Sequence, residues 1–448
     1  MDNKEILNKK HIHFIGICGI SMSALALLLR HLGAKITGSD AQFDSIISTL
    51  SSNDIKVFVG HSENNISKNC DLIVYTGAIG NDNVELNFAI KNHIPIIERA
   101  ELLGKVCEIY DNVIAVGGTH GKTTTTAMIA SIFEMAGLNP TVHLGGISNL
   151  FNSNLKIGNT KYFITEACEY KNSFRFIKSN TAVITSTDPD HLDTYNSVAE
   201  LKNAYLNFAK NANNVVLGSV VNDINRKGNI VKVGYNNCNL IAKNIRSNKG
   251  IYSFDAFYNG KYLTNFKLNS IGKFNVDNAL CAIAVALEYG ISISVIYDAL
   301  NSFVGVKRRN ECIGYINNVP IICDYAHHPT EIVSTLKAYR EVYKNILCVF
   351  QPHTYTRTKT FMSDFKNCFK GVKSLVIYKT YPARELKIDG GDGVDLFENV
   401  KISKDCKCYV DNKYQLKKVV VNLCKNMDCV LVLGAGNIYN IAKNVFKS

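Results

Sequence analysis

The chain has 448 residues, of which 46% are hydrophobic and 20% charged, and it carries a formal net charge of +12. This length is too great for one hydrophobic core and indicates roughly three domains, while the composition is ordinary for a soluble globular protein. Lysine and asparagine are abundant along the chain, and the basic residues form no dense run. The net charge fits a protein that binds anionic substrates, but the even abundance of lysine and asparagine favours a compositional bias as its cause. We expect no nucleic-acid-binding module.

Cysteine usage and apolar runs indicate the compartment. The fourteen cysteines are scattered singly and their closest pairs lack zinc-site spacing, so we expect free thiols in a reducing cytosol. Gly16 and Gly19 interrupt the apolar stretch over residues 9–29, which favours a strand-turn-helix over a signal peptide. The longest apolar run elsewhere, Ala279–Leu287, is too short to cross a bilayer. We predict a cytoplasmic protein without membrane insertion.

The first block of the chain, residues 1–109, alternates strands with helices. It opens with a strand over His11–Ile15, a glycine turn and a helix over Met22–His31. Further strands are expected over residues 34–37, 56–59, 72–75 and 94–97. This alternation is typical of a Rossmann-like domain.

The glycine turn of this block, Gly16-Ile-Cys-Gly-Ile-Ser21, keeps only the first glycine of the Gly-x-Gly-x-x-Gly pattern that binds dinucleotides. Cys18 and Ser21 occupy the other two positions, and Asp40 lies near where a ribose-binding acid would stand. An NAD-dependent dehydrogenase is therefore one hypothesis and a plain strand-to-helix turn is the other. The two missing glycines count against NAD.

The second block, residues 110–309, opens with a phosphate-binding loop. The strand Val113–Val116 leads into Gly117-Gly-Thr-His-Gly-Lys-Thr-Thr124, and a helix follows. Because position 116 is Val where the full Walker A spacing has Gly, this is the shorter Gly-Thr-His-Gly-Lys-Thr form. Backbone N–H groups at the helix start favour an anion. Lys122 adds a charge for the β- and γ-phosphates, and the Thr123 hydroxyl can bind Mg²⁺.

Two further features of this block suggest metal ligands. Glu166 follows the expected strand Tyr162–Thr165, at the edge that faces the ligand crevice in an open α/β sheet. Asp190-His191 follows the expected strand Ala182–Thr185 through a short loop. Because Mg²⁺ prefers oxygen ligands, His191 taken alone could equally be an ordinary loop histidine.

The third block, residues 310–448, again alternates strands with helices and closes with Gly434-Ala-Gly-Asn-Ile438 before a last helix. Its expected strands cover residues 320–323, 346–350, 375–378 and 430–433, after helices of the second block near 198–209 and 276–289. We therefore predict an α/β fold of three domains. The N-terminal and C-terminal domains are Rossmann-like, and the central domain is a P-loop ATPase-like parallel sheet.

Seven motifs follow one another along the chain. They are Gly118-Thr-His-Gly-Lys-Thr-Thr124, Glu166, Asp190-His-Leu-Asp193, Asn275-Val-Asp-Asn278, Gly305-Val-Lys-Arg-Arg309, Asp324-Tyr-Ala-His-His-Pro-Thr-Glu331 and Phe350-Gln-Pro-His353. In this order they resemble the ATP-dependent Mur ligases of peptidoglycan precursor synthesis, over essentially the whole chain. Two further stretches narrow the resemblance, His13-Phe-Ile-Gly16 near the start and Phe350-Gln-Pro-His-Thr-Tyr-Thr-Arg357, which continues the last motif. With them the chain is most similar to the family members that use L-alanine.

The resemblance implies an amide-forming ligase. In this family a carboxylate attacks the γ-phosphate of ATP to give an acyl phosphate, which an amine then displaces. The expected substrates are UDP-N-acetylmuramate, through its lactyl carboxylate, and L-alanine, with ATP and Mg²⁺, in a monomer or weak homodimer. The sequence does not distinguish alanine from glycine, serine or a peptide. A ligase that recycles peptides onto the same nucleotide sugar and a non-catalytic nucleotide-binding homologue are the alternatives.

The resemblance also implies roles by position. The residues expected to bind ATP are Gly118, Thr119, His120, Gly121, Lys122, Thr123, Thr124, Asn278, Arg309 and Asp324. The metal would be bound by Thr123, Glu166 and His191. Gly16, Gly19, Ser39 and Asp40 would bind the UDP moiety, with Tyr325 at the alanine end. The expected catalytic residues are Lys122, Glu166, His191, His327, His353 and Arg357.

The sequence departs from the family pattern at several positions. Cys18 and Ser21 replace usual glycines of the UDP turn, and Ser186 replaces a usual Asn. The other departures are Phe274 for His, Asn310 for Phe and Thr354 for Arg. None replaces an expected metal ligand or the loop lysine, so we predict a working enzyme with an altered substrate grip.

Overall fold

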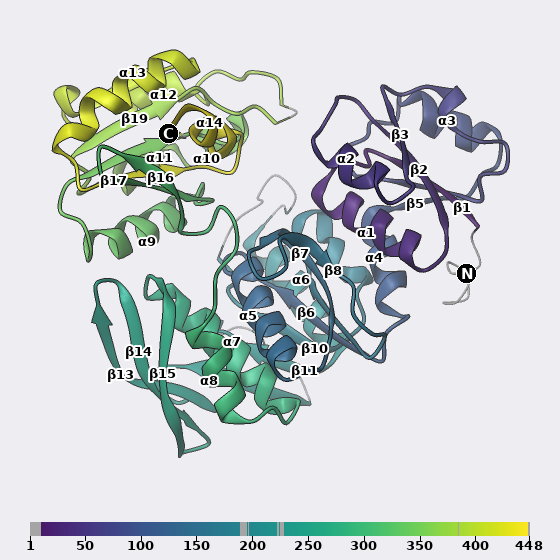
Figure 1. Cartoon of the computed structure of the whole chain (residues 1–448), viewed down its shortest axis with the longest axis horizontal. Helices are drawn as coiled ribbons and strands as arrows, with labels where there is room; N and C mark the ends of the chain where they lie inside the picture. Colours follow the sequence, from purple (N-terminus) through teal and green to yellow (C-terminus); the bar gives the residue numbers. More distant parts are fainter. Residues whose placement is uncertain are drawn as a thin grey trace. The chain divides into compact units, whose positions relative to one another are not determined.

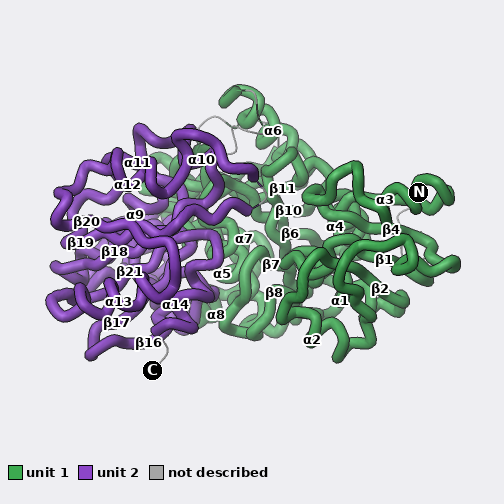
Figure 2. The backbone as a smooth tube through the Cα atoms, turned by 90° about the horizontal axis from the view of Figure 1, so that it is seen from above, with its two compact units in different colours: residues 1–241, 258–260, 278–299 green, residues 242–257, 261–277, 300–448 purple. Residues whose placement is uncertain are grey.

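The computed structural model describes residues 10–188, 195, 197–221, 224, 228–383 and 385–446. Within them the strands form three sheets, each accompanied by helices (Figure 1). Packing divides the chain into two compact units (Figure 2). The first unit comprises residues 1–241, 258–260 and 278–299, and the second comprises 242–257, 261–277 and 300–448. The predicted three-part α/β fold is confirmed, while the domain boundaries at 109/110 and 309/310 stay predictions.

The first sheet lies in the first unit and has the order β3-β2-β1-β4-β5, with every pair parallel. Its elements are β1 (His11–Ile15), α1 (Ile20–His31), β2 (Lys35–Asp40), α2 (Ile46–Ser51), β3 (Lys56–Val59), the 3₁₀ turn η2 (Glu63–Asn65), β4 (Leu72–Tyr75), α3 (Val84–Lys91), β5 (Ile96–Glu98) and α4 (Arg99–Cys107). This is the predicted Rossmann-like order. In this class ligands bind beyond the carboxyl ends of the strands, where the order reverses between β1 and β4.

Burial explains the first elements of this sheet. All of β1 is buried, and α1 is apolar and buried on more than one side, since the consecutive residues from Met22 to Ala26 are all buried. The helix therefore packs against the first sheet and also against two strands of the second sheet. β2 runs further than the sequence predicts and ends at Asp40, because Gly38 and Ser39 continue the parallel pairing with β1. Neither residue type favours strands, so pairing outweighs propensity here.

The second sheet has the order β15-β14-β13-β12-β11-β10-β6-β9-β7-β8. Its elements are β6 (Asn112–Gly117), α5 (Lys122–Met135), β7 (Thr141–Ser148), β8 (Ser153–Lys156), β9 (Tyr162–Glu166), the 3₁₀ segment η3 (Tyr170–Phe176), β10 (Ser179–Ile184), α6 (Val198–Lys210), β11 (Ala212–Leu217), β12 (Asn229–Gly234), β13 (Leu240–Asn248), β14 (Ile251–Tyr258), β15 (Lys261–Ile271), α7 (Phe274–Glu288) and α8 (Ile293–Asn301). The pairs from β12 across to β7 are parallel, and β8 pairs antiparallel with β7. The phosphate-loop strand β6 lies between β10 and β9.

Several strands of this sheet were not predicted, namely β7, β8, β11, β12 and the β13–β15 ribbon. The ribbon is connected by two-residue turns, Lys249-Gly250 and Asn259-Gly260, in which all four residues have positive φ. Such turns match the right-handed twist of two antiparallel strands. The central part of the chain is therefore more than the parallel sheet that the sequence predicts.

The third sheet lies in the second unit and has the order β16-β17-β21-β18-β19-β20. Its elements are β16 (Glu311–Ile316), β17 (Val319–Asp324), α9 (Pro329–Arg340), β18 (Ile346–Phe350), α10 (Tyr355–Thr360), α11 (Met362–Cys368), β19 (Ser374–Tyr378), α12 (Gly393–Asn399), η4 (Lys404–Cys406), β20 (Lys407–Val410), α13 (Lys413–Leu423), η5 (Cys424–Asn426), β21 (Cys429–Leu433) and α14 (Ile438–Phe446). Within this part of the described chain, β16 pairs antiparallel with β17, and the other neighbouring strands pair in parallel. Register places Asp324, Leu433 and Phe350 side by side at one sheet edge.

The cysteines and the helices can be compared with the expectations from the sequence. All fourteen cysteines, which lie within the described ranges, are free thiols, as the sequence predicts. Among the helices of the described residues, none combines the length and the apolar character that crossing a membrane requires.

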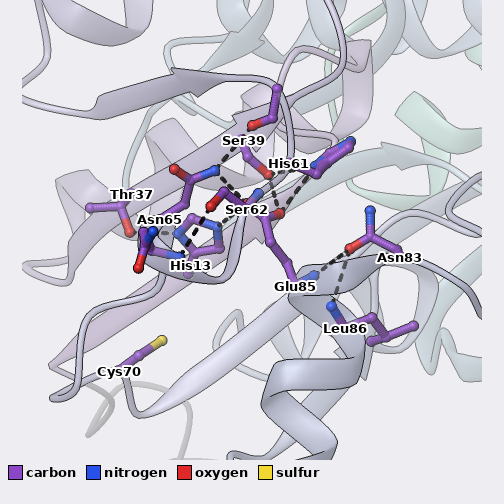
Figure 3. Close-up of polar contacts among 12 residues, drawn as sticks. His13, Thr37, Ser39, His61, Ser62, Asn65, Cys70, Asn83, Glu85 and Leu86 are labelled. Atoms are coloured by element: carbon purple, nitrogen blue, oxygen red, sulfur yellow. Dashed lines mark hydrogen bonds and ion pairs between the residues drawn. The ribbon is translucent and has the colours of Figure 1, made fainter.

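A buried carboxylate, that of Glu85 on α3, ties loops of the first sheet together (Figure 3). Its oxygens accept hydrogen bonds from Asn65 Nδ2 at 2.6 Å, from the backbone N–H of Ser62 at 3.3 Å and from the Ser39 hydroxyl. His61 Nδ1 lies 3.1 Å from the same carboxylate. One side chain thus holds the end of β2, the loop after β3 and the start of α3.

These donors keep Glu85 ionised. Burial alone would raise the pKa of this carboxyl, but His13, whose Nε2 lies 3.9 Å away, and the donors Ser39 and Asn65 lower it to about 2. A group whose folded pKa is lowered stabilises the fold above its ordinary pKa, and this stability is lost as the pH falls through the folded pKa. The shift from 4.5 to about 2 corresponds to roughly 3 kcal/mol.

We predict that Glu85→Gln removes an acid-sensitive part of the stability. The variant should be less stable than the wild type by about 2–3 kcal/mol near pH 7, and this gap should narrow as the pH falls below about 4.5. Urea unfolding followed by circular dichroism near pH 7 and near pH 4 measures both. Asp54→Asn is the control, because the Asp54 side chain is 85% exposed in its pair with Arg30 and should contribute less than about 1 kcal/mol. A gap independent of pH would contradict the prediction.

Candidate active site

The phosphate-binding loop connects β6 to α5, as the sequence predicts, and residues after β10 hold its shape. The backbone N–H groups of Thr119 and His120 donate to the carbonyl and hydroxyl oxygens of Ser186, at 3.0 and 2.8 Å. The Thr185 hydroxyl donates to the carbonyl of Gly117 at 3.2 Å. Ser186, where the family pattern usually has Asn, is therefore a structural part of the loop.

Two glycines of the loop have left-handed backbone and no room for a side chain. Gly118 has φ 127°, and a Cβ there would lie 2.9 Å from the backbone nitrogen of Ser186. Gly121 has φ 83° and precedes α5, and a Cβ there would collide with the amide oxygen of Asn278. Both positions require glycine. The Asn278 oxygen also accepts from the Thr125 hydroxyl at 3.2 Å, so this residue lies against α5, and its contact with adenine stays a prediction.

Lys122 begins α5, and three oxygens hold its ammonium. Its Nζ donates to the carbonyls of Gly118 at 2.6 Å and Thr119 at 3.2 Å, and to Glu169 Oε1 at 3.0 Å. The Glu169 side chain is 2% exposed. Burial disfavours the charged lysine, but the adjacent Glu169 carboxylate outweighs this effect, and the pKa of Lys122 is raised. Lys122 is therefore a fixed positive charge at the loop.

The remaining loop residues contact the segment after β10. The Thr119 hydroxyl donates to the carbonyl of Asp188 at 2.7 Å, and His120 Nε2 lies 3.6 Å from the Asp188 carboxylate. Thr124 lies half-buried in the first turn of α5. All residues from Gly118 to Thr124 therefore surround one helix N-terminus, where backbone N–H groups favour an anion.

Thr123 and Glu166 form an oxygen pair suited to Mg²⁺. The Thr123 hydroxyl donates to Glu166 Oε2 at 3.1 Å, and the backbone N–H of Gly145 donates to Oε1 at 2.6 Å. Mg²⁺ is usually bound by one or two protein oxygens together with substrate phosphates and waters, so this donor set beside a phosphate loop fits. The third predicted ligand, His191, lies outside the described residues. Within the described residues no cluster of three or more His, Cys, Asp or Glu could hold a metal by itself.

The first glycine turn is organised by the end of β2. The carbonyl of Ser39 accepts from the backbone N–H groups of Gly16 and Ile17, at 2.8 and 3.0 Å. Asp40 Oδ2 accepts from the backbone N–H of Cys18 at 2.9 Å. Gly19 precedes α1. The predicted UDP-binding residues are therefore brought together, but the Ser39 hydroxyl is directed to Glu85.

In the second unit, Asp324 ends β17 and organises the turn that follows. Its carboxylate accepts from the backbone N–H groups of Ala326 and Asn310, at 2.9 and 3.0 Å. Burial raises the pKa of Asp324, and the charge of Arg309 opposes this shift. Tyr325 lies between two guanidinium groups, because the Cζ atoms of Arg308 and Arg309 are 4.8 and 4.7 Å from its ring centroid.

The predicted histidines and arginine of the third sheet also come together. The rings of His327 and His353 have centroids 5.7 Å apart, and Arg357 Nη1 lies 3.4 Å from His353 Nδ1. His327 Nδ1 is 3.2 Å from the Glu331 carboxylate. Thr354 has φ 65°, which is unusual for a β-branched residue, and its hydroxyl caps α10 by accepting from the N–H of Arg357 at 3.4 Å. Thr354, where an Arg is common, therefore positions the helix that carries Arg357.

The sequence analysis missed two residues with clear contacts. Glu169 is the partner of Lys122, and its place three residues after Glu166 in the same loop was the available signal. Arg308 donates to the carbonyls of Gly434 and Gly436, at 3.3 and 2.8 Å, and so holds the glycine turn before α14. The neighbouring Arg309, which the sequence analysis assigned to the nucleotide, lies over the Tyr325 ring, and its role stays a prediction.

Models of one protein family match the chain in three consecutive segments. The Mur ligase family, catalytic domain, matches residues 11–110, and the Mur ligase middle domain matches residues 116–286. The Mur ligase, glutamate ligase domain, matches residues 308–436. These segments cover most of the chain.

Individual proteins agree with these matches. The UDP-N-acetylmuramate–L-alanine ligase of Clostridium tetani is 43% identical over 445 residues, which are 96% of each chain. The solved structure of the UDP-N-acetylmuramate-alanine ligase of Thermotoga maritima has a TM-score of 0.85 and 29% identity, over 97% of this chain and 98% of that one. A murein peptide ligase of Psychrobacter arcticus shares the fold, with a TM-score of 0.73 and 23% identity over 97% and 98% of the two chains. The chain belongs to the Mur ligase family.

Proposed function

We propose that this protein is an ATP-dependent ligase that joins L-alanine to the lactyl carboxylate of UDP-N-acetylmuramate through an acyl phosphate. The observation that carries the proposal is the grouping of Lys122, Thr123 and Glu166 at one phosphate loop. Support comes from the full-length relative of that activity, at 43% identity.

The chemistry requires positioned charges and no protein nucleophile. A lactyl carboxylate oxygen attacks the γ-phosphorus of ATP, and ADP leaves. The amine nitrogen of alanine then attacks the acyl carbon and loses a proton, and inorganic phosphate leaves. Lys122 supplies a half-buried positive charge, which Glu169 stabilises, and it would lie beside the phosphate that is transferred.

Mg²⁺, when bound, neutralises charge on the phosphates of ATP. Thr123 and Glu166 would hold it, together with His191. The loop residues from Gly118 to Thr124 would bind the phosphates through backbone N–H groups. Asn278, with Arg309 and Asp324, would bind the rest of the nucleotide.

The two remaining substrates are assigned to separate edges. Gly16, Gly19 and Asp40 lie at the turn where the Rossmann class binds diphosphates, which suits the UDP moiety. Tyr325, His327, His353 and Arg357 lie at the carboxyl edge of the third sheet and would line the alanine end. The dehydrogenase hypothesis depended on the first turn alone and is dropped. A cytoplasmic monomer or weak homodimer, with domains over residues 1–109, 110–309 and 310–448, completes the proposal.

The first test is a substrate panel. Purified protein with ATP, Mg²⁺ and UDP-N-acetylmuramate should release phosphate with L-alanine, and product mass should show one added alanine. Glycine, L-serine and the murein tripeptide are run in parallel. Turnover with the tripeptide but not with alanine would favour the recycling ligase, and no product with any amine would refute a ligase.

The second test concerns the loop lysine. Lys122→Met should lower kcat by at least about 100-fold, because charge stabilisation of the transferring group is lost. Removing only the lysine also leaves Glu169 buried without its partner, which costs stability. The double variant Lys122→Met/Glu169→Gln removes both charges and should fold better while remaining inactive. Wild-type turnover in either variant would contradict the role of Lys122.

The third test compares two carboxylates three residues apart. Glu166→Gln should raise the Mg²⁺ concentration needed for half-maximal rate by about 10-fold or more, because a charged oxygen ligand is lost. Glu169→Gln should leave that concentration nearly unchanged and lower the rate, because this carboxylate pairs with Lys122. Chelation with EDTA should abolish turnover in the wild type. An equal Mg²⁺ shift in both variants would contradict the assignment.

A further inference from the structure

A chain of polar contacts that the reaction does not use connects the first glycine turn to β9. His143 lies on β7 and is 4% exposed. Its Nε2 lies 3.0 Å from the Ser21 hydroxyl at the start of α1, and its Nδ1 lies 3.0 Å from the Thr165 hydroxyl on β9. Thr165 directly precedes Glu166, the proposed metal ligand. All of these residues belong to the first compact unit.

The other contacts fix the direction of each hydrogen bond. Arg99 Nη1 donates to Ser21 Oγ at 3.3 Å, and the Ser21 hydroxyl donates to His143 Nε2 when the ring carries its single proton on Nδ1. Thr165 Oγ1 donates to the carbonyl of Glu166 at 3.1 Å, so it accepts from His143 Nδ1. The imidazole is therefore the neutral Nδ1–H form. Burial and the charge of Arg99 lower the pKa of His143 to about 3, which agrees with a neutral ring.

The strand that carries His143 also holds the metal carboxylate. Two residues further along β7, the backbone N–H of Gly145 donates to Glu166 Oε1 at 2.6 Å. The neighbouring strand β8 is attached to α1, because Asn154 Nδ2 donates to the carbonyl of Ile20. Contacts thus connect the start of α1 to β7 and β8, and they reach Glu166 in two ways. The backbone N–H of Gly145 on β7 donates to its carboxylate, and the Thr165 hydroxyl, which His143 contacts, donates to its carbonyl.

Ser21, the first residue of this chain of contacts, is one of the two positions where the sequence departs from the diphosphate-binding pattern. Ser21 occupies the position of the third glycine in Gly-x-Gly-x-x-Gly, and a glycine there could not contact His143. An anionic diphosphate at the turn would attract the Arg99 guanidinium, which holds the Ser21 oxygen. Occupancy of the turn therefore changes the same hydrogen bond that begins the chain.

We propose that Ser21 and His143 are positioning residues that couple occupancy of the first glycine turn to the metal-binding carboxylate, so that the UDP-sugar and the Mg²⁺-nucleotide bind cooperatively. This inference rests on the proposed function, which names the two ligands. Such coupling requires that each ligand favour one arrangement of the contacts from Ser21 through His143 to Glu166 over another. The coupling is reciprocal, so each ligand changes the affinity for the other by the same factor.

The test measures coupling by isothermal titration calorimetry on the full chain. The affinity for a non-hydrolysable ATP analogue with Mg²⁺ is measured with and without saturating UDP-N-acetylmuramate. In the wild type, the UDP-sugar should raise the affinity for the ATP analogue by about 5-fold or more. Ser21→Ala and His143→Asn should each reduce this change to about 1- to 2-fold, and the double variant should lose no more than either single one. Ser21→Thr keeps a hydroxyl and should keep most of the coupling.

Ser23→Ala is the matched control. Ser23 lies in the same helix, and its hydroxyl donates only to the carbonyls of Gly19 and Ile20 in its own turn. This variant should retain the wild-type coupling. An uncoupled wild type, or coupling unchanged in Ser21→Ala, would overturn the inference while leaving the ligase proposal intact. A wild type that binds neither ligand would instead refute the proposed function itself.

Discussion

The ion pair between Lys122 and the buried carboxylate of Glu169 holds the loops of the central sheet in place. A buried carboxylate is stable as an ion only when it stays paired and hydrogen-bonded, so the loops after β6 and β9 must remain together. Ser186 attaches the loop after β10 to the same point. Because β9, β6 and β10 are adjacent in the sheet, their carboxyl ends already converge, and the ion pair fixes what topology brings near.

The same arrangement separates two acidic residues that share a loop. Glu169 Oε1 accepts a hydrogen bond from the Lys122 ammonium, whereas the Glu166 carboxylate accepts hydrogen bonds from the Thr123 hydroxyl and from the backbone N–H of Gly145. A carboxylate with neutral donors can bind an external cation, and a carboxylate with an ammonium partner is already neutralised. The different roles proposed for these two carboxylates therefore rest on which groups stand opposite them, although only three residues separate them in the sequence.

Local patterns predicted much of the fold and of the site. The strand, glycine turn and helix around Lys122 were predicted because phosphate-binding geometry leaves a short signature. Glu166 was singled out because it follows a buried strand. Glu169 was missed although it lies in the same loop, and Arg308 was missed because its partners come from a distant segment of the chain. The two-residue hairpin turn at Asn259-Gly260 could have been predicted, because Asn-Gly is typical of turns in which both residues have positive φ. The long-range link of Ser21 to His143 left none.

Asp40 has a chemical effect beyond shaping the first turn. Its carboxylate caps the backbone N–H of Cys18, whose side chain it also faces. Burial, reinforced by this negative charge, raises the pKa of the Cys18 thiol to about 12. Thiolates rather than thiols react with electrophiles and oxidants. The carboxylate that organises the turn therefore also favours the thiol form of Cys18 over the reactive thiolate.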